Sequence, residues 1–245
     1  DELLFMIFYI DPYDLSIRSY KAHFDQLIRF NTTRSDGKSQ MKPGQHCQRV
    51  KSTMSKTCIL IGAPIDSGKP RKGCVMGPDA YRVAGLTDAL ESLNYTVGDR
   101  GNVSPSAAIA PATLPTHLYA PSETIGWTEA LMNAGEAAIE TGLPIFLGGD
   151  HAMSLGTIAG VARHATRAGR PQFVLWLDAH SDFHTPQSTE TGNLHGTPLG
   201  YVTGREGFYG FPEITKHNPH ANICILGLRN VDLPARELMP HTKKP

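Results

Sequence analysis

The chain has 245 residues, of which 40% are hydrophobic, and this is enough apolar material for one large α/β domain or two small ones. Lys and Arg together number 23, as do Asp and Glu, so the balanced charge gives no strong field to attract nucleic acid or an anionic membrane surface. We therefore expect the partner to be a small molecule. The four cysteines form no Cys-x-x-Cys pair, which favours a reducing, cytoplasmic protein without structural disulfides.

The first part of the chain differs in character from the rest. Residues 1–55 begin with apolar and aromatic residues and continue as a polar run with little periodicity, so we expect a poorly ordered N-terminal extension. Its apolar stretch, residues 3–10, has no basic flank and is much shorter than the roughly 20 residues that span a bilayer. From Thr57 onward, short β-branched runs alternate with longer amphipathic segments. Such alternation is typical of βαβ units, so we expect one α/β domain over residues 56–245.

The expected elements follow in chain order. Strands are predicted at 57–62, near 95–97, and at 144–147, 172–177 and 222–228, and helices at 78–93, 122–141 and 154–168. Ser122 is a candidate helix cap and Gly142 a candidate helix end, while the Pro- and Ala-rich segment 103–116 is expected to be a loop. The layout predicts a mostly parallel sheet, with polar motifs just past the carboxyl ends of its strands, where such sheets bind ligands.

The most informative motif is the run Asp178-Ala-His180-Ser-Asp182, which follows an apolar strand. On an extended backbone, alternate residues turn to the same side, so the two carboxylates and the imidazole would lie on one face. A lone Asp-x-His is more simply explained as a polar strand end whose carboxylate caps backbone groups. Three alternating ligands instead favour a metal-binding face.

A second histidine, His151, follows another strand in the sequence Gly148-Gly149-Asp150-His151. The two glycines permit a tight turn and a close backbone approach. Beside Asp178, His151 becomes a candidate ligand, and Asp150 is expected to orient it or to fix the turn. Oxygen ligands mixed with imidazole suit Mn²⁺, with Fe²⁺, Co²⁺ or Zn²⁺ as alternatives. Two such ions about 3.5 to 4 Å apart would ionise a bridging water near neutral pH and so supply a nucleophile.

A third motif, Gly192-Asn-Leu-His195-Gly196, places a histidine in a glycine-flanked loop. A mobile proton carrier needs such a position. The alternative is a loop histidine that is simply exposed to water.

Together these three motifs resemble the arginase and agmatinase family of ureohydrolases, and the third resembles arginases in particular. The likeness extends from about Lys56 to Asp232. It implies a three-layer α/β/α fold with a mostly parallel central sheet, incomplete at the C-terminal end, and usually assembled as a homo-oligomer, a trimer or hexamer. It implies two Mn²⁺ ions, bridged by Asp178, with His195 as proton shuttle and Asp182 in a catalytic as well as a ligating role. The implied metal ligands are His151, Asp178, His180 and Asp182.

The resemblance also implies which residues hold the amino-acid head group of the substrate. The matching positions are His184, Thr191, Asn193 and Asp232. His184 stands where Asn is usual, and Thr191 stands where Ser is usual. Asp232 is alternatively a turn or helix-cap residue. The implied reaction is hydrolysis of L-arginine to L-ornithine and urea by a metal-bridging hydroxide.

The resemblance implies two further aspartate ligands in a later Ser-x-Asp-x-Asp strand, and the sequence to Pro245 contains no such spacing. The sequence thus supplies four of the six metal ligands that the resemblance implies, and we predict that it binds metal weakly. The alternatives are therefore an agmatinase or other guanidino-compound hydrolase, or a truncated, non-catalytic metal-binding homologue.

Overall fold

The computed structural model describes residues 3–5 and 57–231 of the chain. These residues belong to one compact unit. The expected N-terminal extension therefore lies outside the described residues, except for Leu3–Phe5, and so does Asp232.

The strands form two three-stranded sheets, and every pairing within them is parallel. One sheet has the order β3-β2-β4 and the other the order β1-β5-β6. The parallel pairing confirms the expected sheet type. Among the described residues, however, the strands form two separate sheets and not one continuous sheet. The strands are β1 (Leu3–Phe5), β2 (Thr57–Ala63), β3 (Thr96–Asn102), β4 (Leu143–Gly148), β5 (Gln172–Leu177) and β6 (Ile223–Leu226).

Strands β2 and β4 lie at the centre of the hydrophobic core. Residues 58–63 of β2 and 144–148 of β4 are all buried, without the in-and-out alternation of a strand that faces water. Burial of consecutive residues requires cover on both faces of a sheet, which parallel strands receive from their crossover helices. The continuous apolar sequences of these strands thus account for the three-layer α/β/α fold.

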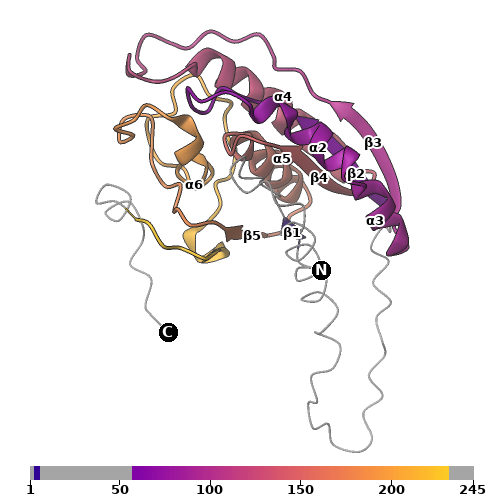
Figure 1. Cartoon of the computed structure of the whole chain (residues 1–245). Helices are drawn as coiled ribbons and strands as arrows, with labels where there is room; N and C mark the ends of the chain where they lie inside the picture. The colour runs from indigo at the N-terminus through magenta and orange to yellow at the C-terminus, as the bar shows by residue number, and fades with distance from the viewer. Residues whose placement is uncertain (1–2, 6–56, 232–245) are drawn as a thin grey trace, which may run out of the picture. The chain divides into compact units, whose positions relative to one another are not determined.

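The described helices connect these strands, as Figure 1 shows. The α-helices are α2 (Gly77–Val83), α3 (Leu86–Ser92), α4 (Pro121–Ile139), α5 (Met153–Arg167) and α6 (Pro198–Val202). Three 3₁₀ turns, η2 (Cys74–Met76), η3 (Leu194–Gly196) and η4 (His220–Asn222), lie in the connections. Among the described residues, no helix combines the length and the apolar character that a membrane span requires.

Two sequence-based predictions about helices are wrong. The single helix expected over 78–93 is two helices, because Gly85 adopts a left-handed backbone with φ 84°, which interrupts the helix, and it is the N-cap of α3. Ser122 does not cap α4, since the cap position is Ala120 and has no side-chain hydrogen bond. The Ser122 hydroxyl instead accepts a hydrogen bond from the Ala110 N–H at 2.9 Å, which ties the preceding loop to the helix.

Helices α4 and α5 pack closely because α5 presents two glycines one turn apart (Figure 1). A Cβ atom at Gly156 would come within 2.4 Å of the Thr128 carbonyl oxygen, and one at Gly160 within 2.4 Å of the Met132 carbonyl oxygen. Both obstacles are backbone atoms of α4, so they cannot move aside as a flexible side chain does. The glycines therefore set the separation of the two helices.

Replacement of Gly160 by Ala is expected to destabilise the fold. Overpacking costs about 1 to 3 kcal/mol, and the better helix propensity of Ala offsets only about 1 kcal/mol of it. The measurement is urea denaturation, with Thr166→Ala on the same helix as the control. A Gly160→Ala variant more stable than the parent would show that the higher helix propensity of Ala outweighs the overpacking. It would also show that α4 and α5 are free to move apart.

Candidate metal centre

The candidate site lies where β4 and β5 end. Strand β4 ends at Gly148, three residues before His151, and β5 ends at Leu177, next to Asp178. The apolar sequences of the strands fix where each strand ends, and the polar residues follow at that point. The prediction that both motifs follow strand ends is confirmed.

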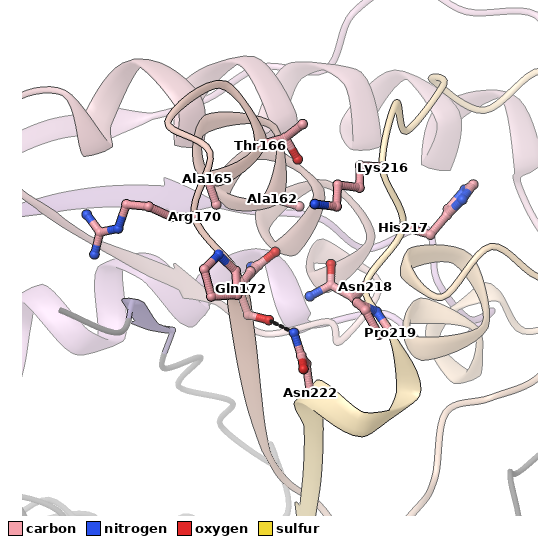
Figure 2. Close-up of a pocket in the computed structure, with 11 residues that line it drawn as sticks. Ala162, Ala165, Thr166, Arg170, Gln172, Lys216, His217, Asn218, Pro219 and Asn222 are labelled. Atoms are coloured by element: carbon pink, nitrogen blue, oxygen red, sulfur yellow. Dashed lines mark hydrogen bonds between the residues drawn. The ribbon is translucent and has the colours of Figure 1, made fainter.

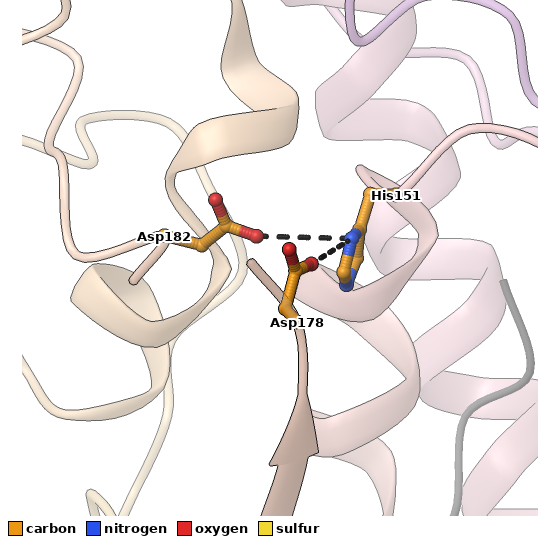
Figure 3. Close-up of side chains that lie close together, drawn as sticks. All are labelled: His151, Asp178 and Asp182. Carbon is orange, nitrogen blue, oxygen red and sulfur yellow. Dashed lines mark ion pairs between the residues drawn. The ribbon is translucent and has the colours of Figure 1, made fainter. Parts of the chain in front are cut away.

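Three of the predicted ligands come together, as Figure 3 shows. His151 Nδ1 lies 3.0 Å from Asp178 Oδ2 and 3.7 Å from Asp182 Oδ2. Each of the three residues offers one ligand atom, and these atoms all lie within 4.8 Å of one another. One imidazole and two carboxylates are a donor set that suits a divalent ion such as Mn²⁺, Fe²⁺ or Zn²⁺. The residues therefore fit a metal ion by both placement and chemistry.

Burial and mutual contact shift the pKa values of this group. Burial, opposed by the charge of His151 and assisted by that of Asp178, raises the pKa of Asp182 to about 6. Burial also acts on Asp178, but the hydrogen bond and charge of His151 outweigh it and lower the pKa of Asp178 to about 2. Burial lowers the pKa of His151, but the hydrogen bond to Asp178 and the charges of three carboxylates, Asp182, Asp178 and Asp150, outweigh this effect and raise it. The group is thus a partly buried cluster of two carboxylates and an imidazole, which a cation would stabilise.

The alternation of ligands in this motif predicted an extended backbone. In the structure the backbone is not extended throughout. Asp182 adopts a left-handed conformation with φ 47°, which is uncommon for a residue other than glycine. The Asp182 carbonyl oxygen accepts hydrogen bonds from Leu199 N at 2.9 Å and Gly200 N at 3.3 Å, at the start of α6. These contacts hold the turn that brings the Asp182 carboxylate to His151.

His180 lies outside the cluster of three. Its side chain is 60% exposed, with Nδ1 3.4 Å from Asp178 Oδ1. Its backbone N–H donates to the same Asp178 oxygen at 2.9 Å, and the residue forms a parallel bridge with Asn230. Asp178 consequently stands between His151 on one side and His180 on the other. A carboxylate in this position would be shared if two ions were bound.

Asp150 is completely buried and holds the turn that carries His151. Its Oδ2 accepts a hydrogen bond from Gly68 N at 2.8 Å, and its Oδ1 accepts one from Ala152 N at 3.0 Å. Burial raises its pKa, against the lowering effect of these two bonds. Of the two roles expected for Asp150, these contacts correspond to fixing the turn.

The variant Asp150→Asn is expected to lose about 1 to 3 kcal/mol of unfolding free energy, because an amide has one accepting oxygen and leaves a buried backbone N–H unpaired. Urea denaturation measures the loss. Asp88→Asn, at an exposed position in the first turn of α3, is the matched control. Equal stability of the two variants would exclude the structural role of Asp150.

The glycines of this motif are required by close contact. A Cβ atom at Gly149 would lie 2.3 Å from the Cys74 carbonyl oxygen, and one at Gly77 would lie 2.4 Å from the Gly148 carbonyl oxygen. The loop 73–77 therefore packs directly against the backbone that precedes His151. The expected close backbone approach at Gly148-Gly149 is confirmed.

His195, the predicted proton carrier, lies in η3 and is partly buried. Its backbone N–H donates to the Gly68 carbonyl oxygen at 3.2 Å, so the same loop residue contacts both Asp150 and the His195 segment. Burial and the positive charges of Lys69, His151 and His180 lower the pKa of His195 to about 4. Its ring is therefore neutral at pH 7.

Three of the predicted substrate contacts lie in the connection between the cluster and η3. The His184 N–H donates to the Gly196 carbonyl oxygen at 3.2 Å, and His184 Nδ1 lies 3.1 Å from Ser188 Oγ. The hydroxyl of exposed Thr191 accepts a hydrogen bond from Asn193 N at 3.3 Å. The fourth, Asp232, falls outside the described residues, but the N–H groups of Arg229 and Asn230 both donate to the Ala179 carbonyl oxygen at 2.9 Å. That segment thus runs beside the ligand motif.

One residue of the site was missed by the sequence analysis. The Trp176 ring stacks on the His151 imidazole, with centroids 4.6 Å apart and planes inclined by 24°. Trp176 lies on β5, is 3% exposed and precedes Asp178 by two positions in the sequence. The period of two along a strand is a signal that could have placed it on the same side as the aspartate.

Comparison with known proteins decides the family. The model of the Arginase family matches residues 56–244. The chain belongs to the arginase family. It is 48% identical over 189 residues to an arginase of Brucella melitensis, covering 76% of this chain and 61% of that one. It is 46% identical over 178 residues to an arginase of Agrobacterium fabrum, covering 72% of this chain and 55% of the other.

The arginase fold is confirmed by solved structures. The native structure of Bacillus caldovelox arginase matches with a TM-score of 0.62 and 31% identity, over 74% of this chain and 60% of that chain. A Bacillus subtilis arginase matches with a TM-score of 0.61 and 33% identity, over 74% of this chain and 59% of that chain. This arginase-family chain therefore spans about three fifths of the length of the relatives that it matches.

Proposed function

We propose that the protein is a manganese-dependent arginase that hydrolyses L-arginine to L-ornithine and urea. The observation that carries the proposal is the cluster of His151, Asp178 and Asp182 at the carboxyl ends of two strands, in a chain whose relatives are named arginases. A partly buried group of one imidazole and two carboxylates is a poor way to hold a fold together, because charges are expensive to remove from water.

Each residue of the proposed site would have a separate role. His151, Asp178 and Asp182 would hold one Mn²⁺, and Asp178 and His180 would hold a second. When bound, the ions supply Lewis acidity and a water that ionises near neutral pH. Asp150 keeps His151 in place through its two backbone hydrogen bonds, and Trp176 covers one face of the imidazole.

His195 would carry a proton between the nucleophilic water and the leaving amine. Its neutral ring at pH 7 is able to accept a proton, and nearby His184, Thr191 and Asn193 would hold the α-amino and α-carboxylate groups of the substrate. This arrangement separates the metal ligands from the residues that recognise the amino-acid head group. The rival substrate is agmatine, which lacks the α-carboxylate.

The experiment that separates these substrates measures urea release with Mn²⁺ from arginine, agmatine and guanidinobutyrate. We expect arginine to be preferred, since Thr191 and Asn193 offer hydrogen-bonding groups to a carboxylate. Preference for agmatine would reassign the protein as an agmatinase. Binding of Mn²⁺ without urea release from any of the three would identify a non-catalytic metal-binding homologue.

A further inference from the structure

The two sides of the candidate metal centre come from different sheets. His151 follows β4, which pairs with β2, whereas Asp178 follows β5, which pairs with β1 and β6. No hydrogen-bonded ladder joins β4 to β5 among the described strands. The alignment of the two strand ends therefore depends on packing and not on sheet hydrogen bonds.

Trp176 makes one of these packing contacts at the metal centre itself. It lies on β5, two positions before Asp178, and its indole ring stacks on the His151 imidazole with centroids 4.6 Å apart and planes inclined by 24°. Attraction between stacked aromatic rings is worth up to about a tenfold change in an equilibrium constant. A side chain on the strand of Asp178 thus contacts the ligand that follows the other sheet.

The indole of Trp176 is itself held firmly. Trp176 is 3% exposed, and its backbone is paired with Ile225 of β6. The start of β5 is anchored as well, because the Gln172 carbonyl oxygen accepts a hydrogen bond from Asn222 Nδ2 at 3.0 Å, as Figure 2 shows. A ring on a strand that is fixed at these positions is a rigid surface for the imidazole.

The stack uses the face of the His151 imidazole and leaves its Nδ1 edge to the carboxylates. His151 Nδ1 lies 3.0 Å from Asp178 Oδ2 and 3.7 Å from Asp182 Oδ2 (Figure 3). A bound ion would replace these direct contacts, because it would bind the same side chains. The stack with Trp176 does not compete with an ion. The hydrogen bonds of Asp150 are to backbone N–H groups, so they hold the turn but not the ring.

One further feature distinguishes Trp176 from a residue that only fills the core. Its indole Nε1 is buried and has no hydrogen-bond partner among the described residues. A buried N–H without a partner costs free energy, so a side chain without this group would stabilise the core better. What the indole supplies in return is a large flat face against His151.

We propose that Trp176 is a positioning residue of the metal centre, whose indole face holds the His151 imidazole so that Nδ1 faces the two carboxylates. The proposal rests on the metal site of the proposed function and not on the identity of the substrate. It predicts that metal affinity depends on an aromatic face at position 176. A residue that only filled the core would affect stability without a specific effect on metal affinity.

Calorimetric titration of the full chain with Mn²⁺ tests the proposal. Trp176→Leu is expected to weaken Mn²⁺ binding about tenfold, because loss of a group that orients a ligand costs roughly 10- to 100-fold in affinity. Trp176→Phe keeps an aromatic face, so its affinity is expected to stay within about threefold of the parent. Circular dichroism verifies folding. If Trp176→Leu does not fold, Trp176→Met replaces it with the same expectation, because the flexible Met side chain fills irregular gaps.

The matched control is Trp127→Leu. Trp127 is the other tryptophan of the chain, lies on α4 and is 4% exposed, but it is not stacked on His151. Its loss is expected to lower stability and to leave Mn²⁺ affinity within about twofold of the parent. Parental affinity in Trp176→Leu, an equal loss of affinity in Trp127→Leu, or no Mn²⁺ binding by the parent would overturn the proposal. A parent that binds Mn²⁺ but releases no urea would contradict the proposed function and not the role of Trp176.

Discussion

Replacement of Asp178 by Asn is expected to reduce Mn²⁺ affinity by about 100-fold or more and to abolish urea release. Asp178 contacts His151 through Oδ2 at 3.0 Å and accepts the His180 N–H through Oδ1 at 2.9 Å. Asparagine keeps the shape but has no negative charge and only one accepting oxygen. Loss of groups that merely orient a ligand already costs 10- to 100-fold in affinity, so loss of a shared ligand costs at least as much.

The measurement is a Mn²⁺ titration by calorimetry, accompanied by circular dichroism to verify folding. Asp79→Asn is the matched control, because Asp79 is a carboxylate of α2 whose side chain is 71% exposed. Its affinity for Mn²⁺ is expected to equal that of the parent. Full affinity in Asp178→Asn would remove Asp178 from the metal centre and with it the proposed function.

The sequence predicted the parts of the fold that depend on local pattern. Buried parallel strands such as β2 and β4 are marked by continuous apolar runs, and β5 was placed over residues 172–177 as the structure has it. The break between α2 and α3 was missed because helical spacing of apolar residues continues across Gly85. The division of the strands into two sheets depends on pairing between distant segments, which periodicity does not report.

The candidate site, like the fold, was predicted only in part from local sequence pattern. The convergence of His151 with Asp178 was predictable, since both follow the carboxyl ends of strands, where α/β sheets bind ligands. The exposed position of His180 outside the cluster was not predictable, because the backbone of this motif is not extended throughout, as the left-handed conformation of Asp182 shows. Alternation along a strand predicts a common face only while the chain remains extended.

Replacement of His195 by Ala is expected to lower kcat by about 10² to 10⁴ while Mn²⁺ affinity stays within about twofold of the parent. Removal of a metal ligand changes both quantities, so the two measurements together distinguish a proton carrier from a ligand. Burial and neighbouring positive charges lower the pKa of His195 to about 4, and a bound cation acts in the same direction. The imidazole is then neutral at working pH and able to accept a proton.

The control for this variant is His164→Ala. His164 lies on α5 with Nδ1 3.1 Å from Glu140 Oε1, and it takes no part in the site. It is expected to leave both kcat and Mn²⁺ affinity unchanged. Partial recovery of His195→Ala by added imidazole would support proton transfer, because a free base then replaces the missing one. A loss of Mn²⁺ affinity in His195→Ala would instead make His195 a metal ligand, and unchanged kcat would mean that water alone moves the proton.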